Sequence, residues 1–211
     1  MQQHEIGGMA GVSYYTGDLN TVPFKSSREN LQFFYRWITP AERWVFRGNL
    51  SYVHLAGEDA KANNDFQQQR NLAFDTKLIQ GMLLTEFHFL PFSTFKNSFN
   101  YPFTPYLTFG ISLFYFMPYG TTYLGWEDLY ALDPEYSNFK KLAFDIPVGV
   151  GLKFRIIEQL GLGLEYMLHV PITEYLDGVS LRGSRQKDLF YTLAVQFFYT
   201  FPTKNKACYC L

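Results

Sequence analysis

Residues 187–201 read KDLFYTLAVQFFYTF, and the stretch alternates between two kinds of side chain. One side carries Leu189, Tyr191, Leu193, Val195, Phe197, Tyr199 and Phe201, and the other carries Asp188, Thr192, Ala194, Gln196 and Thr200. A repeat of two residues is typical of a β-strand, because successive side chains of a strand point to opposite faces. The stretch therefore predicts a strand with one fully apolar face.

The composition of the whole chain favours the same class of structure. The 211 residues include 22 Phe, 16 Tyr and 3 Trp, while charged residues make up 18% and the net charge is −1. This balance argues against a nucleic-acid partner and against a disordered chain. No run approaches the ~18 apolar residues of a membrane helix. Alternation with aromatic enrichment is typical of an outer-membrane β-barrel, and a soluble barrel or sandwich is the alternative.

Alternating segments recur along the chain and predict eight strands. They cover residues 5–16, 30–39, 43–55, 72–90, 104–118, 144–155, 160–169 and 189–201. We therefore expect an all-β protein in which residues 1–201 form an eight-stranded antiparallel transmembrane outer-membrane β-barrel. Residues 202–211 are expected to form a separate C-terminal tail.

The lengths of the connections predict an orientation. Short turns follow the second and sixth strands and a turn of intermediate length follows the fourth, whereas the loops near 17–28, 56–71, 118–141 and 173–186 are long. Long loops of outer-membrane barrels normally face outward and short turns face the periplasm, so both termini are expected in the periplasm. The chain starts without a signal-peptide pattern, and we interpret it as the mature form of an exported protein.

Charged residues are expected inside the barrel. Their positions in the alternation point them away from the apolar face, and they comprise Arg47, Glu86, His88, Lys153, Arg155, Glu165 and His169. On the lipid face an Arg or Lys would cost about 2–4 kcal/mol at the membrane midplane, which supports the inward assignment. Charges of both signs predict a lumen filled by ion pairs.

Catalysis and metal binding have little support in the sequence. Some small barrels are lipid-modifying hydrolases, and the nearest arrangement here pairs His169 with Ser180 or Ser184, without a specific spacing. A metal site from His88, His169 and Glu165 also lacks a signature spacing. No phosphate-binding glycine loop is present. We expect a protein that is not an enzyme, with no cofactor and no small-molecule substrate.

Several segments resemble a known family. They are HEIGGMAGVSYYTGDLN (4–20), LTEFHFLPF (84–92), FTPYLTFGISLFYFMP (103–118), AFDIPVGVGLKFRI (143–156) and LGLEYMLHVPITEYLDGVS (162–180). Together they resemble the small outer-membrane barrels of Bacteroidetes, the group that includes PorG of the type IX secretion system. The resemblance covers nearly the whole chain. It implies a structural role in the outer-membrane lipid, in contact with the periplasmic ring built by the lipoprotein PorK and its partner PorN.

The resemblance suggests a role for the C-terminal tail. Lys204 and Lys206 could attract an acidic surface or lipid headgroups, and Cys208 and Cys210 flank a single tyrosine. A disulfide within an extended Cys-x-Cys segment is strained, so we expect an intermolecular bridge to a ring protein in the oxidising periplasm. The alternatives are a frayed tail, and an orphan barrel that acts as a lipid-modifying enzyme or a narrow passive pore. Eight strands argue against the pore.

Overall fold

The computed structural model describes residues 3–16, 26–41, 43–58, 73–90, 92, 102–122, 125–127, 141–157, 159–172 and 189–201. Its strands are β1 (Gln3–Thr16), β2 (Arg28–Ile38), β3 (Trp44–Glu58), β4 (Ala73–His88), β5 (Phe103–Thr122), β6 (Gly125–Glu127), β7 (Leu142–Arg155), β8 (Leu160–Pro171) and β9 (Leu189–Thr200). In this part of the chain no helix is long and apolar enough to cross a membrane.

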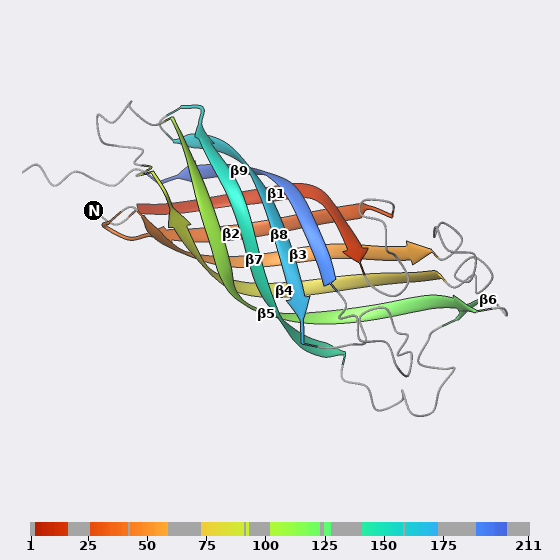
Figure 1. Ribbon diagram of the computed structural model, residues 1–211. Helices are drawn as coiled ribbons and strands as arrows, with labels where there is room; N and C mark the ends of the chain where they lie inside the picture. Colours follow the sequence, from red (N-terminus) through yellow and green to blue (C-terminus); the bar gives the residue numbers. More distant parts are fainter. Residues whose placement is uncertain are drawn as a thin grey trace, which may run out of the picture.

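Eight of these strands close into a barrel, as Figure 1 shows. Every neighbouring pair is antiparallel, and each strand lies beside the next barrel strand along the chain. The first and last strands complete the circle, because β1 pairs with β9 from Glu5 opposite Thr200 to Thr16 opposite Leu189. Closure leaves no unpaired edge among the described barrel strands. The predicted eight-stranded antiparallel barrel is confirmed.

The structure differs from the expected strand boundaries mainly in β5. The alternation predicts an end near residue 118, but the strand continues to Thr122, where it pairs with the three-residue β6. The added hairpin extends one strand and takes no part in closing the barrel. No periodic signal in the sequence marks it, because three residues are too few to show an alternation.

The two ends of the barrel differ. Short turns between β2 and β3 and between β7 and β8 lie at the end that carries Gln3 and Thr200, which we call the turn end. Thr39 and Ile156 close these turns through backbone hydrogen bonds to the carbonyls of Trp44 and Leu160. At the opposite end the connections between barrel strands are longer in sequence than these two turns, as predicted. The third connection at the turn end, residues 89–102 between β4 and β5, is as long as the connection between β3 and β4 at the opposite end.

The outer face of the wall is a band of large apolar side chains. Phe33 is 72% exposed and Leu83 is 68% exposed, and residues of the same kind face outward on every barrel strand. Aromatic pairs gather near the turn end, including Trp37 with Phe46 and Phe103 with Phe154. A closed wall with an apolar outer band and interfacial aromatic residues is the surface that a bilayer requires. The protein is a transmembrane barrel.

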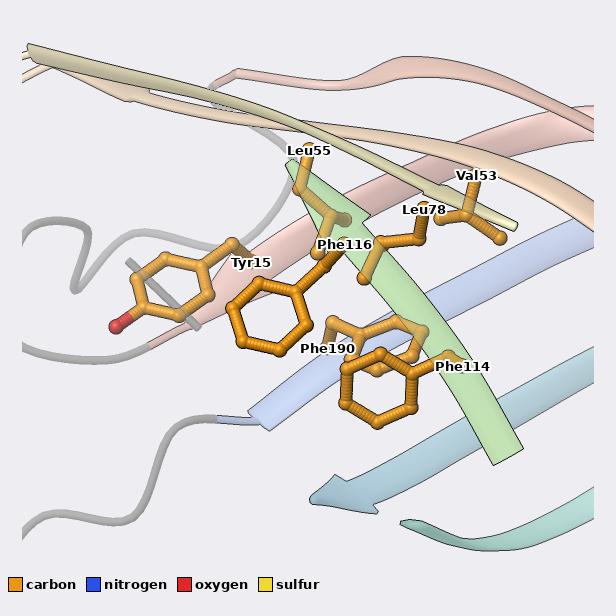
Figure 2. Packing of buried hydrophobic residues seen from close by; sticks show 7 residues of the cluster. All are labelled: Tyr15, Val53, Leu55, Leu78, Phe114, Phe116 and Phe190. Atoms are coloured by element: carbon orange, nitrogen blue, oxygen red, sulfur yellow. The ribbon is translucent and has the colours of Figure 1, made fainter. Parts of the chain in front are cut away.

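The interior end opposite the turn end is closed by an apolar cluster, which we call the apolar plug. Figure 2 shows its side chains from β1, β3, β4, β5 and β9 gathered inside the barrel: Tyr15, Val53, Leu55, Leu78, Phe114, Phe116 and Phe190. All seven side chains are buried. The rest of the lumen holds buried polar side chains together with two smaller apolar clusters, one around Phe34 and Phe198 and one around Met82 and Met167.

Candidate functional site

The lumen near the turn end holds a layer of ion pairs built around one glutamate. Glu86 on β4 accepts hydrogen bonds from Arg36 Nε at 2.9 Å and from His88 Nε2 at 3.0 Å. Arg47 Nη1 lies 2.8 Å from the same Oε1 atom that Arg36 contacts. All four side chains are almost completely buried. The strand alternation sends each of them inward, so β2, β3 and β4 contribute to one cluster.

Two further carboxylates extend this layer across the lumen. Glu165 on β8 accepts two hydrogen bonds from Arg47, at 2.6 and 3.0 Å, in a bidentate arrangement. Glu5 on β1 contacts Lys153 Nζ at 2.7 Å and Arg36 Nη1 at 3.4 Å. Three cations thus face three carboxylates. Each buried charge meets at least one partner of opposite sign, and this compensates part of the desolvation cost of burying it.

Neutral polar groups join the charged layer to the wall. The Tyr106 hydroxyl donates to Glu165 Oε2 at 2.6 Å, and Gln196 Nε2 donates to that hydroxyl oxygen at 2.9 Å. Gln196 Oε1 in turn accepts from Arg36 Nη2 at 2.7 Å. Glycine makes room for these groups, because a Cβ at Gly151 would overlap the Tyr106 ring and one at Gly163 would overlap Gln196. The β7 and β8 glycines therefore serve the packing of the lumen.

A separate polar cluster lies between this layer and the apolar plug. Asp145 on β7 is held by His169 Nδ1 at 2.7 Å, by Gln80 Nε2 at 3.0 Å and by the hydroxyl of Ser112. The His169 ring stacks on Phe190 of the plug, with ring centres 4.2 Å apart. Its Nε2 atom is buried and has no hydrogen-bond partner among the described residues.

Aromatic residues close the lumen on the turn-end side of the charged layer. Phe92, in the connection after β4, is buried and packs edge-on against Phe198 of β9. The ammonium of Lys153 lies 4.9 Å from the Phe92 ring centre and 4.6 Å from that of Phe198. Arg155 contacts the Phe92 ring from 5.0 Å. Cations over aromatic faces are stabilised here because the rings also exclude water.

The structure brings together most of the lumen residues expected from the sequence. Arg47, Glu86, His88, Lys153 and Glu165 belong to the charged layer, and Arg155 lies at its turn-end border, half-buried against Phe92. His169 belongs to the separate Asp145 cluster instead.

Sequence reasoning missed several members of the site. They are Glu5, Arg36, Tyr106 and Gln196 in the charged layer, and Asp145 with Gln80 and Ser112 in the second cluster. The alternation carried the signal for each of them, since Arg36 lies between outward Tyr35 and Trp37. What it does not reveal is which inward residues meet across the lumen.

Other expected site residues lie outside the described part of the chain. These are Lys204, Lys206, Cys208 and Cys210 of the tail, together with Ser180 and Ser184. The boundary between barrel and tail at residue 201 also stays a prediction. Within the described ranges no group of three His, Cys, Asp or Glu side chains could hold a metal ion.

A small polar cluster on the outer face marks the limit of the apolar band opposite the turn end. His54 on β3 bridges two carboxylates, with Nδ1 2.8 Å from Glu29 Oε1 and Nε2 2.7 Å from Asp75 Oδ2. Glu29 lies beyond Leu31, the last apolar outward residue of β2, and is largely exposed. The hydrogen bond from His54 holds the pKa of Glu29 below its usual value of 4.5.

Solved structures with the same architecture are distant in sequence. Neisserial surface protein A matches with a TM-score of 0.54 and 14% identity, over 94% of this chain and 97% of that protein. A major outer membrane protein from Thermus thermophilus matches with a TM-score of 0.54 and 12% identity, over 94% and 99% of the two chains. The shared feature is the fold of small outer-membrane β-barrels, which confirms that predicted class.

The family assignment covers the entire chain. No curated protein matches the sequence significantly. Residues 1–211 match the family described as a domain of unknown function, DUF6089. The match spans the eight barrel strands with the charged layer and the plug inside them. The chain therefore belongs to the DUF6089 family, and its structure is a small eight-stranded outer-membrane β-barrel.

Proposed function

We propose that this protein is a PorG-like, non-enzymatic component of the type IX protein secretion machinery. In this role it sits in the outer membrane and contacts a periplasmic ring made of a PorK-like lipoprotein and a PorN-like protein. The observation that supports a scaffold role is the filled lumen, in which the charged layer lies between the Phe92 contacts and the apolar plug. A barrel filled in this way has its outer surface and its two ends available for partners.

The turn end is the side on which the proposal places the ring. Phe201 donates its backbone N–H to the carbonyl of His4 at 2.9 Å, so the chain is fixed to the turn end just before the tail begins. The short turns at this end support a periplasmic position. Lys204, Lys206, Cys208 and Cys210 follow within ten residues and are proposed to reach the ring.

The experiment is a pull-down of the tagged, full-length protein from its own outer membrane in mild detergent, with and without reductant. We expect the two ring proteins to be recovered with the barrel. Recovery should fall when Cys208 and Cys210 are replaced by Ser, or when reductant is present, if a disulfide contributes to the contact. The Lys204→Gln and Lys206→Gln pair should weaken recovery in a salt-dependent manner.

The control is Lys77→Gln. This substitution removes one exposed lysine of β4 near the end of the barrel opposite the turn end, and it should leave recovery unchanged. Recovery of the barrel alone from membranes whose ring is intact would contradict the proposal. In that case lipid A from a strain that lacks the gene would be compared with the parent lipid, because a difference would favour the lipid-modifying alternative.

A further inference from the structure

The tight turn between β7 and β8 carries two exposed isoleucines. Ile156 is 58% exposed and Ile157 is 55% exposed. Both donate their backbone N–H to the carbonyl of Leu160, at 3.0 and 3.2 Å, so hydrogen bonds within the turn hold the segment that presents them. Turns are usually built from Gly, Pro, Asn, Asp and Ser, which favour the required backbone conformations. Formation of the turn therefore does not explain the two isoleucines.

The other short turn at the same end of the barrel is different. It lies between β2 and β3, has the sequence TPAER (39–43) and contains no large apolar side chain. Each of the two turns follows an outward aromatic residue, Trp37 in β2 and Phe154 in β7. Such aromatic residues mark the level of the membrane–water interface. The isoleucines thus come after the interfacial ring on the aqueous side, where an exposed apolar pair favours a contact with another protein.

The last strand brings the C-terminal tail to the same turn. Thr200 donates its backbone N–H to the carbonyl of Gln159 at 2.8 Å, and the chain leaves the barrel after the next residue. The turn carries Arg155 and Glu158, whose charges cancel, so its contribution to a contact is apolar. The basic residues Lys204 and Lys206 follow in the tail. The apolar pair therefore adjoins the start of the segment that the proposed function assigns to the ring.

We propose that Ile156 and Ile157 insert into an apolar depression on the periplasmic ring protein. This inference rests on the proposed function and names the part of the barrel wall that the ring contacts. Because the turn is already held by its hydrogen bonds, it loses little conformational freedom when it binds. The tail supplies a second contact from the same side of the barrel, and two linked contacts bind more tightly than either one alone.

The test is photo-crosslinking from p-benzoylphenylalanine incorporated at position 157 of the full-length protein in its own outer membrane. We expect an adduct with a ring protein that is at least fivefold stronger than the adduct from the same probe at position 41. Ile156→Gln with Ile157→Gln should lower recovery of the ring in the pull-down at least fivefold. Pro40→Gln with Ala41→Gln is the matched control and should leave recovery unchanged, because both residues are exposed in the other short turn.

Urea unfolding of each variant first verifies that the barrel is folded. Should the double variant of the β7–β8 turn fail to fold, each single Gln variant should lower recovery at least twofold by itself. Unchanged recovery in the folded variants would overturn this inference and leave the proposed function standing. A probe at position 157 that labels only lipid would also overturn it, since the isoleucines would then anchor the turn in the membrane. If the wild-type barrel recovers no ring protein, the proposed function fails and this inference fails with it.

Discussion

At the scale of single residues, Glu86 is the carboxylate around which the charged layer of the lumen is built. One of its oxygens meets both Arg36 and Arg47, and the other accepts from His88. Glu86→Ala leaves two buried guanidinium groups short of a counter-charge, and loss of one partner from a buried ion pair typically costs about 3–5 kcal/mol. We expect a loss of this size in the free energy of unfolding, measured by urea unfolding in lipid vesicles with tryptophan fluorescence.

Glu29→Ala is the matched control for this substitution. Glu29 also contacts a histidine partner, but its side chain is 58% exposed at the rim. Surface ion pairs contribute about 0–1 kcal/mol, so the control should change stability little. If Glu86→Ala cost no more than Glu29→Ala, the charged layer would contribute nothing specific to the stability of the barrel.

The rim cluster makes a pH-dependent prediction. Because His54 lowers the pKa of Glu29 below 4.5, the folded state favours the carboxylate more strongly than the unfolded chain does. The stabilisation from this contact is present above pH 4.5 and is lost as the pH falls through the lower folded-state value. An NMR titration of the Glu29 carboxyl carbon should therefore show a midpoint below 4.5.

The same titration on the His54→Gln variant tests the cause. The carboxyl midpoint should move up toward 4.5, because the main contribution to the shift is the hydrogen bond from His54. A midpoint that stays low in the variant would assign the shift to another group.

Residue-scale reasoning from the sequence reaches the face of a side chain but not its partner. Arg47 and Glu165 are both assigned inward by their place in the alternation, yet their strands are separated in the barrel and their bidentate contact crosses the lumen. Arg36 and Glu5 are placed inward by the same alternation, but nothing in their own strands indicates which side chains they meet. Contacts across a lumen depend on barrel size and stagger, which no local pattern encodes.

At the scale of elements, strands were predictable because one face of each must be apolar in a membrane. The segment expected at 160–169 is β8, and its alternation persists through two glycines, Gly161 and Gly163. The sequence alone does not distinguish glycines that leave room for a lumen side chain from glycines that shape the outer surface. That difference appears only when the neighbouring strands are in place.

A matched pair of substitutions separates the two kinds of glycine. Gly151→Ala would push the Tyr106 ring away from its hydrogen bonds to Glu165 and Gln196. Overpacking of this kind typically costs about 1–3 kcal/mol. Gly81→Ala adds the same methyl group where it meets no atom, and should be neutral or stabilising, because alanine loses less conformational freedom on folding.

Urea unfolding of the two alanine variants, in the same vesicles, gives both free energies. A similar loss for Gly81→Ala and Gly151→Ala would mean that backbone freedom, and not the space around each glycine, sets the cost of substitution in this wall.

At the scale of the whole molecule, the layers inside the barrel predict that it does not conduct ions. Phe92 and Phe198 cover the charged layer on the turn-end side, and the apolar plug closes the other end of the described lumen. An ion would have to separate buried pairs such as Arg47 with Glu165 to pass. Planar-bilayer recordings of the purified protein should show no current steps above those of the bilayer alone.

The layered arrangement also predicts the effect of trimming the plug. Phe116→Ala with Phe190→Ala removes two rings from the apolar cluster, but the charged layer near the turn end remains intact. The trimmed barrel should therefore remain closed, whereas adding Glu86→Ala and Glu165→Ala should loosen both layers and admit current. Conductance in the wild-type protein would restore the passive-pore alternative. Conductance after trimming the plug alone would show that the plug is the main barrier and that the ion pairs do not seal the lumen.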